Sequence, residues 1–292
     1  MIWNWIINIF LLFFLSTSNL PAVTNHSWEA FSLPPSAMKE LVAADKAAVL
    51  SPDGRFLLFD KNADTPQPIA SITKLMTALV FLETNPDWDS YYKIKPADNI
   101  SGGRLNLFLG DTVNLRDLFL TSLVASDNGA TIALVHASGL SESNFIARMN
   151  ELAGELRLDN TAFTDPIGLS ARNVSTAREV ALLAKVALEK PEISEAVSRK
   201  DYSFLTLEGR EKFIESTDYL LFDPAPGELQ PLGGKTGYTD LAGYCFVGRF
   251  EGPGGEQLIA AVLNSPGRND RFRESKAVVG WVLDNFFKKS KD

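Results

Sequence analysis

The spacing of hydrophobic residues along the chain alternates between strand and helix periods. Two short apolar stretches, 47–50 and 55–59, flank the turn Ser51-Pro-Asp-Gly54 and predict a β-hairpin, because Pro presets φ and Gly accepts a positive φ. From Ser71 the apolar residues recur at helical spacing until Pro86. Further helices are predicted in the middle of the chain, at about 115–124, 129–137, 142–156 and 176–188. Later segments predict strands at 202–207, 244–250 and 257–263, and then a last helix at about 272–287.

This order of elements predicts an α/β fold of the α+β type. Strands near both ends of the sequence, with helices between them, favour one mainly antiparallel sheet that is assembled from distant segments and flanked by helices. A helical subdomain is expected as an insertion at about 75–195. We expect one folded domain over 39–292, with no additional β-rich domain at the C-terminus.

The first 38 residues have a different character from the rest. Residues 2–15 are apolar apart from two asparagines, and such a run is too short for a spanning helix but suits the core of a secretory signal. No lysine or arginine occurs before Lys39, so the usual positive start of a signal is missing and a retained anchor stays open. We expect residues 1–38 to be a signal peptide, or an N-terminal anchor plus tether with membrane association. Either role implies export, to the periplasm or the outer face of the cytoplasmic membrane.

The amino-acid composition argues against several classes of function. The net charge is −8 and the basic residues form no long cluster, so nucleic acid is not expected as a partner. The two histidines, His26 and His136, cannot supply a multi-histidine metal site, and the single cysteine, Cys245, cannot form an intrachain disulfide. We expect no metal and no organic cofactor, and any hydrolytic chemistry would have to run without a histidine base.

A serine followed three residues later by a lysine occurs three times, at Ser36/Lys39, Ser71/Lys74 and Ser90/Lys93. In a serine hydrolase without histidine, such a lysine can be the base if its surroundings keep it neutral. Ser71 opens the strongest helical pattern, so it shares a helix face with Lys74 close to the helix N-terminus, whose partial positive charge favours an oxyanion. Ser36 lies in the Pro-rich tether and Ser90 in a loop. The context therefore favours Ser71 and Lys74.

Two further triplets strengthen this choice. Ser126-Asp127-Asn128 lies between two predicted helices. Lys235-Thr236-Gly237 follows two glycines and precedes the predicted strand 244–250. Each triplet occurs once, and the three motifs in this order and at these separations form a strong signal of acyl-transfer chemistry.

The chain resembles the D-alanyl-D-alanine carboxypeptidase family of serine peptidases, the low-molecular-mass penicillin-binding proteins. The resemblance covers about residues 45–285 and includes longer strings that are more specific than the triplets, namely Pro68-Ile-Ala-Ser-Ile-Thr-Lys-Leu-Met-Thr-Ala-Leu-Val80, Asn106-Leu-Phe-Leu-Gly-Asp111 and Phe163-Thr-Asp-Pro-Ile-Gly-Leu-Ser170. It implies the β-lactamase and penicillin-binding fold, which agrees with the elements predicted from periodicity.

The resemblance also implies a role for each residue in the motifs. Ser71 would be the nucleophile and Lys74 its general base, forming an acyl-enzyme on the carbonyl of the penultimate D-Ala. Ser126 would relay a proton to the leaving D-Ala amine, and Asn128 would hydrogen-bond the substrate peptide. These three steps need no metal or cofactor.

The charged parts of the substrate would meet a second set of groups. By resemblance, the backbone N–H groups of Ser71 and of Tyr238, which follows Gly237, would stabilise the oxyanion. Lys235 and Thr236 would bind the terminal carboxylate. An arginine often helps in this family, and the candidates are Arg271, which we favour, Arg268 and Arg273.

The resemblance favours a D-Ala-D-Ala carboxypeptidase that trims peptidoglycan stem peptides and that β-lactam antibiotics inhibit covalently. A D,D-endopeptidase that cuts cross-links stays open, because the chain ends soon after its last predicted helix, without the β-rich domain and amphipathic anchor of many carboxypeptidase relatives. A class A β-lactamase is disfavoured, because Glu-x-x-Leu-Asn is missing: Gly102 and Ala260 stand where its glutamate would be. A wall-binding module without activity is disfavoured because every reactive position is filled.

Overall fold

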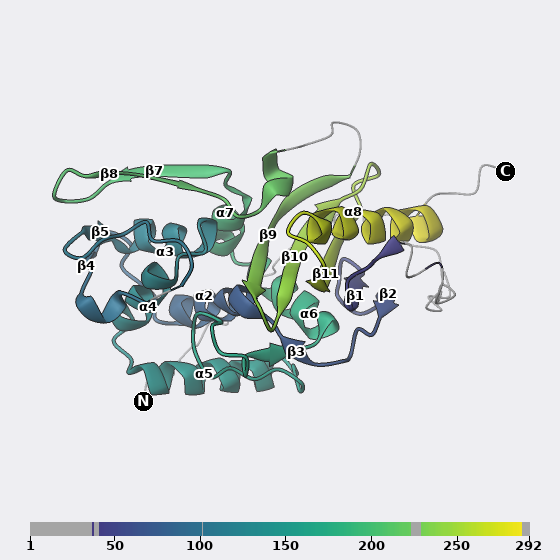
Figure 1. Cartoon of the computed structure of the whole chain (residues 1–292), viewed down its shortest axis with the longest axis horizontal. Helices are drawn as coiled ribbons and strands as arrows, with labels where there is room; N and C mark the ends of the chain where they lie inside the picture. The colour runs from purple at the N-terminus through teal and green to yellow at the C-terminus, as the bar shows by residue number, and fades with distance from the viewer. Residues whose placement is uncertain (1–36, 38–40, 101, 223–228, 288–292) are drawn as a thin grey trace, which may run out of the picture.

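The structure is a computed structural model that describes residue 37 and residues 41–100, 102–222 and 229–287 (Figure 1). The expected signal peptide or anchor at 1–38 lies outside these ranges, apart from residue 37. Within the described ranges, no helix combines the length and the apolar character that a membrane span requires.

A five-stranded antiparallel sheet with the strand order β2-β1-β11-β10-β9 forms the centre of the molecule. Its strands are β1 (Lys46–Leu50), β2 (Leu57–Lys61), β9 (Gln230–Thr239), β10 (Gly243–Glu251) and β11 (Gln257–Ser265). β1 and β2 form the expected hairpin, and β1 also pairs with β11, with Lys46 opposite Leu263. Segments from the two ends of the chain therefore lie side by side, as the pattern predicts.

Helices cover both faces of this sheet, because side chains alternate between the faces along each strand. In β11, Ala260 and Val262 join the core under α8 (Asp270–Val282), whereas Ala261 and Leu263 join the core on the other face. That other face packs against α6 (Ala177–Leu188). The predicted architecture, a mainly antiparallel sheet flanked by helices with a helical insertion, is confirmed (Figure 1).

The helices of the insertion begin where polar side chains cap them. Asn114, Asp127, Ser141 and Thr176 each accept a hydrogen bond from the backbone N–H three residues later. The helices predicted from periodicity are α2 (Lys74–Glu83), α3 (Leu115–Val124), α4 (Asn128–Ala137), α5 (Glu142–Glu155) and α6. One more helix, α7 (Pro191–Ser198), is not predicted by the pattern, and it extends the helical insertion slightly beyond its expected end.

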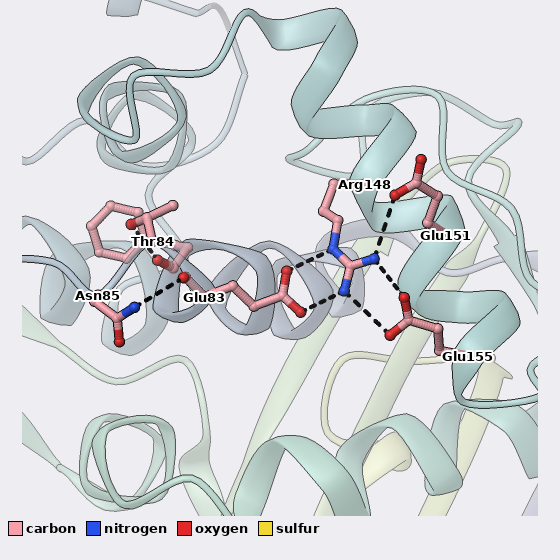
Figure 2. Close-up of polar contacts among 7 residues, drawn as sticks. Glu83, Thr84, Asn85, Arg148, Glu151 and Glu155 are labelled. Carbon is pink, nitrogen blue, oxygen red and sulfur yellow. Dashed lines mark hydrogen bonds and ion pairs between the residues drawn. The ribbon is translucent and has the colours of Figure 1, made fainter.

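Arg148 of α5 forms ion pairs with Glu83 at the end of α2 and with Glu155 of α5 (Figure 2). The Arg148 guanidinium contacts Glu83 through Nε at 2.7 Å and through Nη2 at 2.8 Å, and it contacts Glu155 through Nη1 at 2.6 Å. Hydrogen bonds from Arg148 to Glu83 and then to Glu155 raise the pKa of the guanidinium above its ordinary value. The cluster is partly exposed, so its contribution to stability is modest.

Short strands outside the central sheet are only partly predictable. β7 (Asp201–Leu205) matches a predicted strand and pairs with β8 (Glu211–Glu215) around the expected turn at Glu208-Gly209. This hairpin lies along the helical insertion, where the N–H of Leu207 donates to the carbonyl of Thr112 (Figure 1). The pattern does not predict the pairs of β3 (Gln67–Pro68) with β6 (Val174–Ser175) and of β4 (Tyr91–Lys93) with β5 (Thr112–Asn114).

Candidate active site

The Ser71–Lys74 pair lies where a short turn of 3-10 helix, η1 (Ala70–Thr73), runs into α2. Ser71 Oγ and Lys74 Nζ are 2.9 Å apart, as expected for two residues on one face of a helical turn. Ile72 and Met76 are buried on the core side and fix the turn against the sheet. The predicted pairing of the two side chains is therefore present, with the serine half-buried and the lysine fully buried.

The surroundings of Lys74 favour a neutral amine. Burial lowers its pKa to about 7, opposed by the charges of Asp127 and Asp165. Nζ also donates to Asn128 Oδ1 at 2.8 Å and to the carbonyl of Ile167 at 2.9 Å. A neutral amine has two N–H groups for these two acceptors, which leaves its lone pair for the hydroxyl of Ser71. This arrangement suits a base that removes a proton from a serine.

A second serine–lysine contact lies beside the first. Lys235 Nζ donates to Ser126 Oγ at 2.7 Å, although the two residues come from β9 and from the turn between α3 and α4. Ser126 has a φ of 58°, a left-handed conformation that is uncommon for serine and that costs energy. Burial lowers the pKa of Lys235 well below its ordinary value, and the charges of Lys74 and Arg271 lower it further. A negatively charged ligand would oppose that effect.

The start of α4 holds the second motif in place. Asp127 caps the helix by accepting from the N–H of Ala130 at 2.8 Å, and its other oxygen accepts from the backbone N–H and the side chain of Asn106. Asn128 follows, and its Nδ2 donates to the carbonyl of Gly102 at 2.7 Å. Its Oδ1 is the acceptor of Lys74. Asp127 is thus a scaffold residue, and Asn128 links the base to the loop before β5.

Lys235-Thr236-Gly237 precedes β10, as the sequence suggests, but it lies inside a strand of its own, β9, which the pattern does not predict. Several glycines hide this strand from a propensity-based prediction. Gly237 is required by packing, because a Cβ there would lie 2.7 Å from the carbonyl oxygen of Ile69 and 3.2 Å from the nitrogen of Ser71. Tyr238 comes next, is 49% exposed and stacks on Tyr244 with ring centroids 4.3 Å apart. β9 therefore passes directly beside the backbone of the serine.

The three motifs meet at a pocket of about 410 Å³. Of the predicted site residues, those that line it are Ser71, Ser126, Asn128, Thr236, Gly237, Tyr238 and Arg271. Lys74 and Lys235 lie just behind this lining, where their amines bond to Ser71 and Ser126. All nine predicted residues are thus brought together, including pairs that are far apart in the sequence.

Two of the candidate arginines lie in the pocket. Arg271, in the first turn of α8, is 4% exposed and donates from Nη1 to the carbonyls of Gly237 and Cys245, at 3.1 Å and 3.4 Å. Burial and, after it, the charge of Arg268 lower its pKa to about 10. Arg268 also lines the pocket, and its guanidinium lies 4.8 Å from the ring centroid of Tyr219.

Arg273, the third candidate arginine, has an exposed side chain and pairs with Asp270. It is not among the described residues that line the pocket. Of the three candidates, Arg268 and Arg271 thus line the pocket.

Some residues of the pocket are not predictable from the motifs. Thr236 Oγ1 donates to Thr217 Oγ1 at 2.7 Å, and both residues line the pocket. Arg104, from the loop before β5, lines it as well. Thr217 and Arg104 are isolated residues in segments without periodicity, so no sequence signal distinguishes them.

The loop 163–170 positions the base. Asp165 Oδ1 accepts from the backbone N–H groups of Ile167 and Gly168, and Oδ2 accepts from that of Ser170 at 2.6 Å. This carboxylate therefore shapes the loop that presents the Ile167 carbonyl to Lys74. The Asp-Pro-Ile-Gly string is therefore a loop-forming element.

Replacing Gly168 with alanine is expected to disturb both stability and the site. Gly168 has a φ of 86°, and a Cβ there would lie 2.0 Å from the carbonyl oxygen of Ala70, the residue before Ser71. We expect the free energy of unfolding to fall by about 2–4 kcal/mol, from backbone strain plus overpacking, and acylation of Ser71 to slow.

A matched control is Gly139→Ala, because Gly139 has a φ of 79° but no heavy atom within 4 Å of the added Cβ. This variant should lower the free energy of unfolding by about 1–2 kcal/mol, through backbone strain alone, and leave the acylation of Ser71 unchanged. Denaturant unfolding and penicillin labelling measure the two effects. Equal losses at Gly168 and Gly139 would contradict the proposed contact with the Ser71 turn.

The remaining histidine and cysteine have structural surroundings. His136 Nδ1 lies 2.6 Å from Asp98 Oδ1, and neither residue is among the described residues that line the pocket. Cys245 is fully buried in β10, and burial raises the pKa of its thiol to about 11. In the part of the chain that the structure describes, no three His, Cys, Asp or Glu side chains form a group that could hold a metal ion.

Comparisons of the sequence agree with this geometry. A family model described as D-alanyl-D-alanine carboxypeptidase matches residues 34–267. The D-alanyl-D-alanine endopeptidase of Haemophilus influenzae is 36% identical over 187 residues, which is 63% of this chain and 63% of that protein. The D-alanyl-D-alanine carboxypeptidase DacF of Bacillus subtilis is 30% identical over 259 residues, 85% of this chain and 64% of that protein. This chain therefore spans about two thirds of the length of these curated relatives.

A solved structure gives the same result for the fold. The DD-transpeptidase of Streptomyces K15 superimposes with a TM-score of 0.77 at 27% identity, covering 83% of this chain and 98% of that one. The sheet, the insertion and the pocket with its two serine–lysine contacts thus belong to a penicillin-binding fold. This chain belongs to the D-alanyl-D-alanine carboxypeptidase family of serine peptidases.

Proposed function

We propose that the chain is an exported D-Ala-D-Ala carboxypeptidase that trims the terminal D-Ala from peptidoglycan stem peptides. The observation that carries the proposal is the Ser71 hydroxyl 2.9 Å from a buried lysine amine whose pKa is about 7, at the wall of a pocket. Export would place it in the periplasm or at the outer face of the cytoplasmic membrane, with residues 1–38 as signal peptide or anchor.

Acylation follows from the contacts of Ser71. Lys74 Nζ takes the hydroxyl proton, and Ser71 Oγ forms a bond to the carbonyl carbon of the penultimate D-Ala. The N–H groups of Ser71 and Tyr238 stabilise the negative oxygen of the tetrahedral intermediate. When the C–N bond breaks, the leaving amine receives a proton through Ser126, which Lys235 holds at 2.7 Å. Water then hydrolyses the ester and restores the Ser71 hydroxyl.

The terminal carboxylate of the substrate would lie against cationic groups. Thr236 and Arg271 line the pocket, and Lys235 lies behind them. A carboxylate here would receive charge-assisted hydrogen bonds, which are stronger than neutral ones. It would also counter the effects of burial and of neighbouring cations, which lower the pKa of Lys235 and of Arg271. The same recognition suits a β-lactam, which carries a carboxylate beside its reactive carbonyl and would acylate Ser71.

A D,D-endopeptidase that cuts cross-links between stem peptides is a second candidate. It is favoured by the Haemophilus influenzae relative, whose printed name is D-alanyl-D-alanine endopeptidase. Both reactions need the same nucleophile, base and oxyanion donors, and they differ in the leaving group, which is D-alanine in one and a diamino acid in the other.

Mass spectrometry of muropeptides incubated with the purified chain tests these functions. A carboxypeptidase removes one D-Ala from pentapeptides, and an endopeptidase converts cross-linked dimers to monomers. We expect D-Ala release, and treatment of the chain with penicillin beforehand should prevent it. Unchanged muropeptides, with the chain still folded, would contradict the proposal and favour a wall-binding module without activity.

A further inference from the structure

The charge of the pocket differs from the charge of the chain. The net charge is −8, yet the pocket is lined by Arg104, Arg268 and Arg271, and no aspartate or glutamate is among its described lining residues. In the described part of the chain, none of these three guanidinium groups lies within 4.0 Å of a carboxylate. Arg148, on the surface, is by contrast paired with carboxylates (Figure 2). The pocket therefore suits a ligand with more than one negative charge.

The three arginines form two groups. Arg268 and Arg271 come from the segment at the start of α8, and the charge of one affects the pKa of the other. A single terminal carboxylate, held with Thr236, would use this group. Arg104 comes from the loop before β5, and its Nη1 donates to the carbonyl of Glu215 at 2.9 Å. Because no carboxylate of the described residues pairs with it, the Arg104 guanidinium can bind a separate negative charge on a ligand.

The contacts of Arg104 connect it to groups that would meet the leaving group in the proposed reaction. Glu215, which anchors it, ends β8 just before Thr217, and Thr217 accepts from Thr236. The charge of Arg104 also contributes to the lowered pKa of Lys235, the partner of Ser126. In the proposed reaction Ser126 passes a proton to the leaving amine. The guanidinium of Arg104 is thus on the side of the scissile bond that the leaving group occupies.

We propose that Arg104 binds a second carboxylate on the leaving-group side of the scissile bond, and so raises kcat/KM for cross-linked peptides, whose leaving group is a diamino acid still joined to its own stem peptide, relative to kcat/KM for pentapeptides. Free D-alanine has one carboxylate, which the other group of arginines would take, and a leaving stem peptide has more than one. This inference rests on the proposed acyl-transfer function, and it names a residue that separates the two substrate classes.

The test compares two substrates that share the same acyl-donor stem. One is a monomeric pentapeptide muropeptide, which releases D-Ala, and the other is a cross-linked muropeptide dimer, which releases a stem peptide. The measured quantity is the ratio of kcat/KM for the dimer to kcat/KM for the pentapeptide. This ratio does not depend on how much of a variant is folded, and titration with fluorescent penicillin counts the active sites.

We expect Arg104→Ala to lower this ratio about tenfold or more, as for the loss of a charge-assisted hydrogen bond. Arg104→Lys keeps the charge but loses the planar fork, so its ratio should lie between those of Arg104→Ala and the unmodified chain. The control is Arg55→Ala, which removes an equal charge from the exposed turn between β1 and β2 and should leave the ratio unchanged.

Three outcomes would overturn the inference. Equal losses on both substrates would place the effect on the shared donor stem or on the scaffold. An unchanged ratio in Arg104→Ala would show that Arg104 selects nothing. Release of D-Ala without any cleavage of dimers by the unmodified chain would remove the larger leaving group from its substrates. Failure of the proposed function itself looks different, because the unmodified chain would then cleave neither substrate and take up no penicillin.

Discussion

Replacing Ser71 with alanine is expected to abolish covalent labelling of the chain by a fluorescent penicillin. The substitution removes the oxygen that forms the ester, and loss of the nucleophile in a serine hydrolase lowers turnover by about 10⁶-fold. Little else should change, because the side chain is half-buried and Ile72 and Met76 still anchor the turn. Labelling followed on a denaturing gel, with thermal melting as a check of folding, measures the effect.

The matched control is Ser90→Ala. Ser90 and Lys93 form another Ser-x-x-Lys pair among the described residues, but Ser90 Oγ donates to Asp87 Oδ2 at 2.7 Å and neither residue lines the pocket. This variant should label like the unmodified chain. A label that survives in Ser71→Ala would contradict the assignment of the nucleophile. A label that leaves the unmodified chain within seconds would instead indicate a β-lactamase.

Replacing Lys74 with arginine is expected to slow acylation by about 10²–10⁴-fold, the usual contribution of a general base. Arginine stays protonated at any pH that the protein tolerates, so it keeps the charge and cannot accept the proton of Ser71. Lys74→Met, which matches the length of the lysine stem without charge or donors, should lose as much. The measurement is the second-order rate of penicillin acylation, with Lys93→Arg as the control.

The pH dependence of acylation follows from the same group. The pKa of Lys74 is lowered to about 7, so the amine is protonated and inactive as a base below that pH and neutral above it. The acylation rate should therefore rise with pH, up to about tenfold per unit below 7, and level off above it. The Lys74→Arg variant, in which Lys235 is still present, should not show this rise of the acylation rate with pH. An acylation rate that stays constant between pH 6 and 8 in the unmodified chain would contradict the role of Lys74 as base. So would an acylation rate of Lys74→Arg within tenfold of that of the unmodified chain.

Much of the fold could be predicted because its main elements are regular in sequence. α3, α4, α5 and α6 follow apolar spacing and begin after capping side chains such as Asn114 and Thr176. β9 could not be predicted, since its glycines lack the side chains that mark a strand. The structure shows why they are there: a Cβ on Gly233 would lie 2.7 Å from the carbonyl oxygen of Val197, and one on Gly234 would lie 2.4 Å from that of Val247.

The reactive pair of the site could be predicted because it is local. Ser71 and Lys74 are one helical turn apart, so their contact depends on little more than η1 and the first residue of α2. The acceptors that keep Lys74 in place, the carbonyl of Ile167 and the amide of Asn128, come from distant loops, and no spacing rule brings them there. The same holds for Arg104, whose position depends on its contact with Glu215.

The pairing of β1 with β11 has a consequence for folding during translation. Lys46 lies opposite Leu263, so most of the chain separates two neighbouring strands of the central sheet. A nascent chain emerges from the ribosome with β1 first, and this strand must wait for nearly all of translation before its partner exists. Ser71 therefore stays without its finished surroundings until synthesis is almost over.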